Sequence, residues 1–106
     1  MTHEYTILLG GTVIPGGGAP EATAVAWAHD TVLLVGSDED VRAISRGDSH
    51  FFDLGGRFVV PLDGPLDPGS QADLAVFEHD PRTTESPLIR LAVVRAGRVI
   101  EGRLGP

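Results

Sequence analysis

The sequence contains no cysteine and no lysine, and each absence excludes a type of chemistry. Without cysteine among its 106 residues, disulfides, thiolate metal sites and cysteine nucleophiles are excluded. All eight basic side chains are arginines, so neither a Schiff-base lysine nor a carboxylated lysine bridging metal ions can form within the chain.

Basic charge and long apolar runs are also scarce. Fifteen acidic residues give a net charge of −7, and they are spread along the chain. This opposes binding to nucleic acids and anionic membranes, which both select a basic surface. The first apolar run lacks preceding basic residues and is shorter than a signal-peptide core or the ~20 residues of a membrane span, so we expect no membrane segment and a cytoplasmic location.

The residues that are present favour a folded β-rich domain. Hydrophobic residues make up 42% of the chain and charged residues 22%, so we expect a single domain over residues 1–106. Short β-rich runs alternate with glycine, proline and Asx turns, which predicts an all-β sandwich or small barrel of about eight strands. The predicted strands cover residues 5–14, 22–28, 31–35, 51–53, 57–60, 74–77, 88–95 and 98–101.

Three local patterns refine this prediction. Residues 22–28 alternate alanine with Thr, Val and Trp, which is the period of a strand with two covered faces. Ser37 as N-cap, followed by three acidic residues, predicts one short helix that Gly47 closes. Pro61 should end its β-ladder because proline has no N–H to donate, and residues 62–73 should form a connector of turns.

Several segments, taken in order, resemble the amidohydrolase superfamily, especially its imidazolonepropionase and long-chain amidohydrolase-like branches. YTILLGGTVIPGG, AVAWAHDTVLLVGSDEDVRAI and FFDLGGRFVVP resemble the part before the catalytic barrel. GPLDPGSQADLAVFEHDP and RLAVVRAGRVIEG resemble the part after it. The chain departs from the family at the first hairpin, where HDTV stands in place of Asp-Gly-Arg-Ile.

The resemblance implies a composite β-sandwich without the barrel. Residues 1–61 would be the pre-barrel segment and residues 62–106 the post-barrel segment of one module. In the family, a His-x-His pair after the first segment opens the barrel and supplies two metal ligands. A barrel needs about 250 residues, and only a short turn follows Pro61.

The four histidines do not form a recognisable metal site. None has His-x-His or His-x-x-x-His spacing or matches a family ligand, and we interpret them as exposed or capping residues. A fortuitous site would use His79 with Glu78 and Asp80. We therefore predict no catalytic, metal-binding or cofactor-binding residue. The histidines are His3, His29, His50 and His79.

Other candidate residues have structural interpretations too. Asp73 precedes a predicted strand, so we expect it to bond turn amides near Gly69 and Ser70 rather than to act as a catalytic acid. Glycines 16–18 do not join a strand to a helix, so they form no phosphate loop. No serine lies in a nucleophile-elbow pattern. The serines considered are Ser37, Ser45, Ser49, Ser70 and Ser86.

These observations lead to three hypotheses of function. The first is a non-catalytic module that forms a dimer or docks on a separate protein, because a sandwich without its barrel exposes apolar surface. The second is an accessory subunit of an amidohydrolase acting on non-peptide C–N bonds, with the barrel supplied by another chain. The third is a ligand cleft walled by aromatics, although core packing explains them more simply. The aromatics are Trp27, Phe51, Phe52, Phe58 and Phe77.

Overall fold

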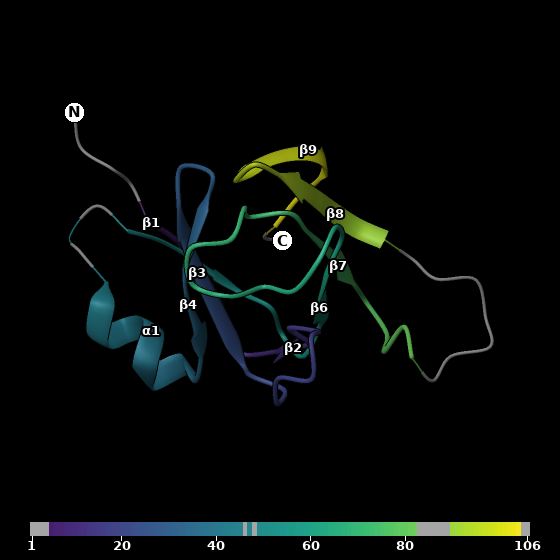
Figure 1. Ribbon diagram of the computed structural model, residues 1–106, viewed down its shortest axis with the longest axis horizontal. Coiled ribbons are helices and arrows are strands. Elements are labelled where there is room, and N and C mark those ends of the chain that lie inside the picture. Colours follow the sequence, from purple (N-terminus) through teal and green to yellow (C-terminus); the bar gives the residue numbers. More distant parts are fainter. Residues whose placement is uncertain (1–4, 46, 48, 83–89, 105–106) are drawn as a thin grey trace.

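A computed structural model describes residues 5–45, 47, 49–82 and 90–104. This part of the chain contains nine strands and one short helix, which confirms the all-β prediction (Figure 1). The elements are β1 (Tyr5–Leu9), β2 (Thr12–Val13), β3 (Ala24–Ala28), β4 (Thr31–Gly36), α1 (Asp38–Ile44), β5 (His50–Asp53), β6 (Phe58–Pro61), β7 (Leu74–Phe77), β8 (Arg90–Arg95) and β9 (Arg98–Gly102).

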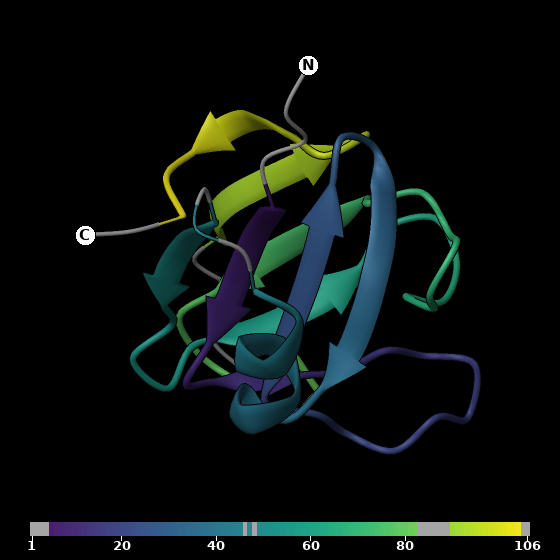
Figure 2. The same cartoon turned by 90° about the vertical axis from the view of Figure 1, so that its left-hand side faces the viewer.

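The strands form two sheets that pack face to face, with α1 on the outer side of the first (Figures 1 and 2). The first sheet has the order β4-β3-β1-β5 and the second the order β2-β6-β7-β8-β9. The predicted strand over residues 5–14 is therefore two strands in different sheets. Gly10 allows this change of direction, because its φ of +74° suits glycine and a side chain there would meet Asp53.

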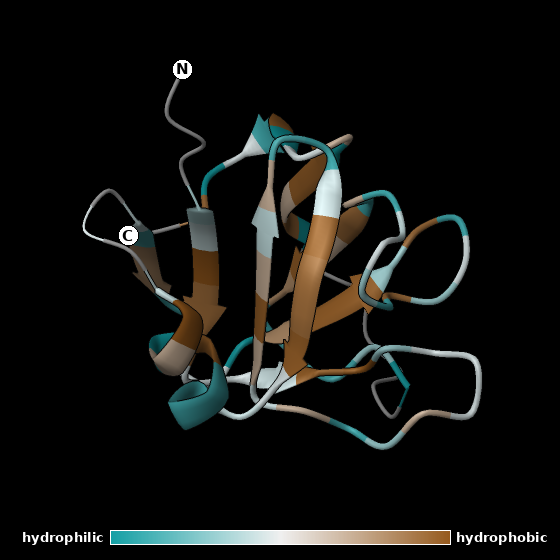
Figure 3. Ribbon diagram, turned by 60° about the vertical axis from the view of Figure 1, so that its left-hand side comes forward, coloured by the Kyte–Doolittle hydropathy of each residue, from teal (hydrophilic) through white to brown (hydrophobic). Residues whose placement is uncertain are grey.

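Strand β3 has two buried faces, as its alternation predicted. Val25 and Trp27 belong to the main core between the sheets. Ala24 and Ala26 belong to a second cluster, which includes Val41 of α1. Figure 3 shows the matching pattern, with hydrophobic colour along the strands and hydrophilic colour on the turns.

Helix α1 begins as predicted and ends earlier. The Ser37 side chain accepts a hydrogen bond from Asp40 N, and the Asp40 carboxylate accepts one from Ser37 N, which completes a capping box. The C-cap is Ser45 in an extended conformation, so the prediction that Gly47 closes the helix is wrong. Ser45 ends the helix because its N–H and hydroxyl both donate to Arg42 O.

The second sheet joins strands from both parts of the chain through the antiparallel β6–β7 pair. Pro61 is the last residue of β6 and pairs with Leu74, so the ladder ends at Pro61 as predicted, and just beyond it Leu62 N donates to Asp73 O at 3.2 Å. The Leu62–Asp73 bond implies that the Pro61 nitrogen faces away from β7. On that other side β2 has already ended at Val13, so no bond is lost.

The turns follow the sequence prediction where the structure describes them. His29 and Ala96 have positive φ values of 54° and 50° in the turns of the β3–β4 and β8–β9 hairpins. Residues 62–73 form turns, with an isolated bridge between Thr31 and Gln71. The predicted loop after residue 78 and the start of the strand predicted at residue 88 lie partly outside the described residues. Among the residues described, no helix has the length and apolar character that crossing a membrane requires.

Candidate functional site

The described histidines lie at separate places in the fold. His29 is in the β3–β4 turn, His50 is the first residue of β5, and His79 follows β7, while His3 lies outside the described residues. In the described part of the chain, no three His, Asp or Glu side chains come together as a possible metal site.

The acidic loop around His79 has a local electrostatic explanation. Asp80 accepts hydrogen bonds from the Arg82 guanidinium and backbone N–H, and these bonds hold the pKa of Asp80 below its usual value. The same guanidinium reaches Glu21 at 2.8 Å. Arg82 therefore links this loop to the segment before β3, and Asp80 acts as its anchor.

Asp73 is the buried charged residue of the described chain, with 8% of its surface exposed. Its carboxylate accepts hydrogen bonds from Ala96 N at 2.8 Å and from the Gln71 amide at 2.9 and 3.0 Å. The structural interpretation of Asp73 fits this geometry, but the expected partners were wrong. Ser70 instead bonds Asp67, and Asp73 holds a turn 23 residues away.

The surroundings of Asp73 favour its charged form. Burial raises its pKa, but the hydrogen bonds from Gln71 and Ala96 and the nearby Arg95 together bring the pKa below its ordinary value. A carboxylate held charged by bonds to amides is a poor proton donor near neutral pH. This environment suits a structural cross-link and not a catalytic acid.

Two hairpin turns meet beside Asp73. The Trp27 indole donates to Gly97 O at 3.1 Å, and Gly97 N donates to Ala72 O at 3.0 Å. A side chain at Gly97 would lie 1.5 Å from His29 O, so only glycine fits between the turns. This turn junction, made by Trp27, His29, Asp73, Ala96 and Gly97, fastens the first sheet to the second.

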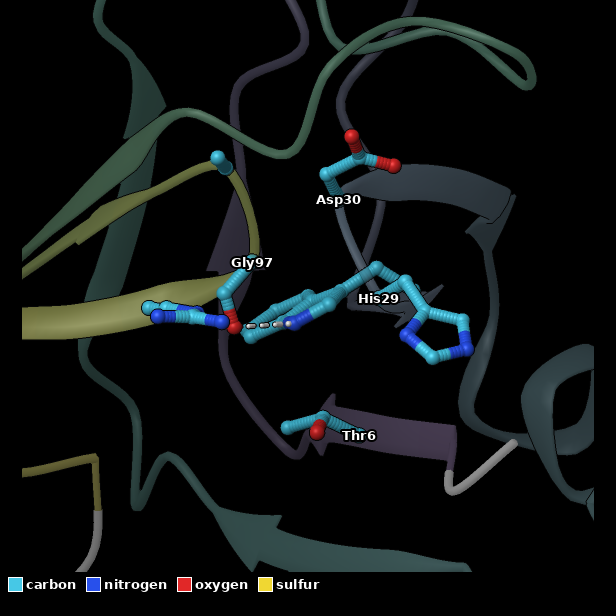
Figure 4. A pocket seen from close by; sticks show the side chains of 7 residues that line it. Thr6, His29, Asp30 and Gly97 are labelled. Carbon is cyan, nitrogen blue, oxygen red and sulfur yellow. Dashed lines mark hydrogen bonds between the residues drawn. The ribbon is translucent and has the colours of Figure 1, made fainter. Parts of the chain in front are cut away.

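An open recess of about 730 Å³ lies against the turn junction (Figure 4). Thr6, His29 and Asp30 lie on different sides of it and do not point toward one another (Figure 4). The recess therefore brings together no nucleophile with a base. Its lining consists of Thr6, Trp27, His29, Asp30, Ala96, Gly97 and Arg98.

The serines and the glycine run have local roles where they are described. Ser37 and Ser45 cap α1, and Ser70 exchanges hydrogen bonds with Asp67 in a turn. Glycines 16–18 all have positive φ in a loop between β2 and β3, which is not a strand-to-helix junction. Ser86 lies outside the described residues.

The aromatic side chains do not line a common cleft. Trp27 is buried and Phe52 packs against the main core, while Phe58 and Phe77 face each other across β6 and β7. Phe51 departs from the core-packing prediction, because 48% of it is exposed. Alternation along β5 turns Phe52 inward and Phe51 outward, onto the face where α1 packs over β1, β3 and β4.

Phe51 lies on a partly apolar surface beside α1. It borders a recess of about 640 Å³ together with Leu9, Arg42 and Asp53. We call Phe51 and the residues that line this recess the β5 patch. The alternation in the sequence indicates that Phe51 and Phe52 point to opposite faces of the sheet. The position of α1 then determines that the Phe51 side chain is left exposed.

Comparison with known proteins gives limited similarity. No protein-family model and no curated protein sequence matches the chain. It resembles an uncharacterized metal-dependent hydrolase from Pyrococcus furiosus, with 22% identity and a TM-score of 0.49 over 54% of this chain and 13% of that one. It also resembles an uncharacterized metal-dependent hydrolase from Pyrococcus horikoshii OT3, with 23% identity and a TM-score of 0.48 over 54% of this chain and 12% of that one. Similarity at this level assigns neither a family nor an activity.

Proposed function

We propose that this chain is a non-catalytic, amidohydrolase-like β-sandwich module that works by association through the β5 patch. The occupant of the patch is a second copy of the chain or a separate protein. The observation that carries the proposal is Phe51, a large aromatic left 48% exposed on an ordered strand. Aromatic residues in exposed patches are typical of association surfaces.

The arrangement of the chain supports the amidohydrolase-like part of the proposal. Residues before and after the short connector contribute neighbouring strands, β6 and β7, to one sheet. This arrangement supports a composite sandwich of the kind that the sequence resemblance implies, in which residues 1–61 and 62–106 would be the two segments.

The non-catalytic part rests on how the candidate residues are used. Asp73 joins two turns, Asp80 binds Arg82, and Ser37, Ser45 and Ser70 cap local structure. Each of these polar side chains already has a structural role in a small domain. Phe51, in contrast, is exposed and is not part of the core, and association with another protein would explain an aromatic side chain at this position.

The test is sedimentation of purified protein over a concentration series, comparing the natural chain with Phe51→Ser. We expect the natural chain to form dimers, or to capture a partner when co-expressed, and Phe51→Ser to lose this association. Val99→Ser is a matched control, because Val99 is 42% exposed on β9. The control should behave as the natural chain does.

Two outcomes would overturn the proposal. Association unchanged in Phe51→Ser would remove the β5 patch from the interface. Hydrolysis of amide or cyclic amide substrates by the purified chain, with stoichiometric zinc bound, would show that the module is catalytic by itself.

A further inference from the structure

The two sheets have four edges, and in the described residues three of these are closed or irregular. The edge of β4 is covered by the connector at Val32, where Val32 N donates to Ser70 O and Gly69 N donates to Val32 O, both at 2.8 Å, and its register with β3 is irregular between Ala26 and Trp27. The edge of β2 is closed by reciprocal bonds between Val13 and Ala22. Such coverage is a common protection of sheet edges against pairing with another chain.

The edge at β9 is irregular. The register of β8 and β9 shifts between Val93 and Val94, and β9 ends at Gly102 with a φ of +72°. A bulge of this kind twists an edge strand and interrupts the regular spacing of its outward N–H and C=O groups. Val99 and Ile100 are exposed on β9, but this strand is a poor template for another strand.

Strand β5 is the regular edge. It pairs in parallel with β1 from Thr6–His50 to Leu9–Asp53 without a register shift and contains no proline (Figure 2). Leu54 N donates to Leu9 O at 2.7 Å, which fixes the alternation along the strand. Residues in phase with Leu54, such as Phe52, bond to β1, so the backbone N–H and C=O of Phe51 and Asp53 point out of the sheet.

From this geometry we infer that two copies of the chain pair antiparallel through β5, with Phe51 opposite Phe51 at a two-fold axis. The central pair exchanges hydrogen bonds between its two backbone N–H and C=O groups, and the two first sheets become one continuous sheet. The inference rests on the proposed function and specifies its partner. It makes the partner a second copy and places the β5 patches of the two copies side by side.

Charge and side-chain pairing favour a second copy in this register. With Phe51 at the axis, Asp53 of each copy faces the small Ser49 of the other, and two aromatic rings lie on the same face of the sheet. A register centred on Asp53 would instead place two carboxylates opposite each other. The recess at the patch carries Arg42 as well as Asp38 and Asp53, so the meeting surfaces contain both signs of charge.

The first test compares Phe51→Pro with Phe51→Val in sedimentation equilibrium. Both variants replace the ring by a small apolar side chain, but only proline removes the outward N–H. Because that N–H does not bond to β1, the internal ladder remains, and circular dichroism should show an intact fold for both. We expect Phe51→Pro to dimerise at least ~10-fold more weakly than Phe51→Val. Equal dimerisation by the two variants would overturn the backbone pairing.

The second test needs no substitution and measures amide hydrogen exchange in the natural chain. Exchange at Phe51 and Asp53 should slow as the protein concentration rises, while exchange at Phe52, already bonded to β1, should stay constant. The natural chain could form a dimer that Phe51→Ser disrupts, while amide exchange at Phe51 does not depend on concentration. That result would overturn the strand pairing but would still support the proposed function. A natural chain that stays monomeric at millimolar concentration would also overturn the pairing, while capture of a separate partner at the patch would still support the function.

Discussion

The turn junction and the edge of β5 differ in how completely their polar groups are satisfied. At the junction, Asp73 accepts from Ala96 N at 2.8 Å and Trp27 donates to Gly97 O at 3.1 Å. At β5, the backbone groups of Phe51 and Asp53 that point out of the sheet make no backbone hydrogen bond to another described residue, and Phe51 is 48% exposed. The junction therefore joins the two sheets, whereas we propose that the β5 edge pairs with a partner. Substitutions at the junction should change stability alone, and substitutions at the edge should change association alone.

The largest effect should come from Gly97→Ala at the junction. The new Cβ would lie 1.5 Å from His29 O, at a φ of +77°, so the two turns must separate. We expect a loss of about 3 kcal/mol or more in the free energy of unfolding, measured by urea titration with Trp27 fluorescence. Gly55→Ala is the control, because Gly55 also has positive φ but open space around it, and it should lose only about 1 kcal/mol. Similar losses in the two variants would contradict the close packing of the turns.

Asp73→Ala should have the next largest effect. The variant leaves Ala96 N–H and the Gln71 amide without their acceptor, which should cost about 2 to 3 kcal/mol in thermal or urea unfolding. Asp63→Ala is the comparison, since Asp63 pairs with Arg95 on the exposed surface and such pairs contribute at most about 1 kcal/mol. Dimerisation of Asp73→Ala, measured below its melting temperature, should equal that of the natural chain. A weaker dimer in Asp73→Ala would contradict this separation, because it would show that the turn junction also affects association at β5.

The contribution of Asp73 should depend on pH. Its pKa is lower in the folded chain than in the unfolded chain, so its stabilising effect is complete above the unfolded pKa of roughly 4 and is lost as pH falls through the folded value. The stability difference between the natural chain and Asp73→Asn should therefore be constant near neutral pH and shrink below about pH 4. A difference that persists unchanged to pH 2 would mean that the carboxylate is not held in its charged form.

The smallest effect should be that of salt on association. Each copy carries a net charge of −7, so two copies repel each other at long range. Raising the salt concentration from about 0.05 M to about 0.5 M should strengthen the dimer by a few-fold in sedimentation equilibrium, because screening weakens this repulsion. Weaker association at high salt would point to ion pairs, and not the apolar β5 patch, as the main contact.

Local patterns were sufficient to predict much of the fold. The alternation in β3, the Ser37 cap and the hairpin turns at His29 and Ala96 depend on neighbouring residues, and the structure confirms them. The errors concern distant partners. The strand predicted over residues 5–14 divides between two sheets, and the partner of Asp73 is a turn 23 residues away.

Phe51 is the most informative error for the candidate site. Alternation in the sequence correctly separates it from Phe52, but a strand in this position can be covered on both faces, as β3 is. Whether Phe51 is buried depends on how far α1 extends across the sheet, and no local pattern determines that distance. The exposed residue that carries the proposed function could therefore be found only in the assembled fold.

The bond from Leu62 N to Asp73 O has a consequence for protein engineering. This bond joins the first and last residues of the connector, residues 62–73. The pairing of β6 with β7 therefore holds the two ends of the connector together. Gly64, near the start of the loop, is exposed with open space around it. Each doubling of loop length costs only about 0.6 kcal/mol of closure entropy. We therefore expect the fold to tolerate a folded guest domain inserted at Gly64, provided that the ends of the guest lie close together.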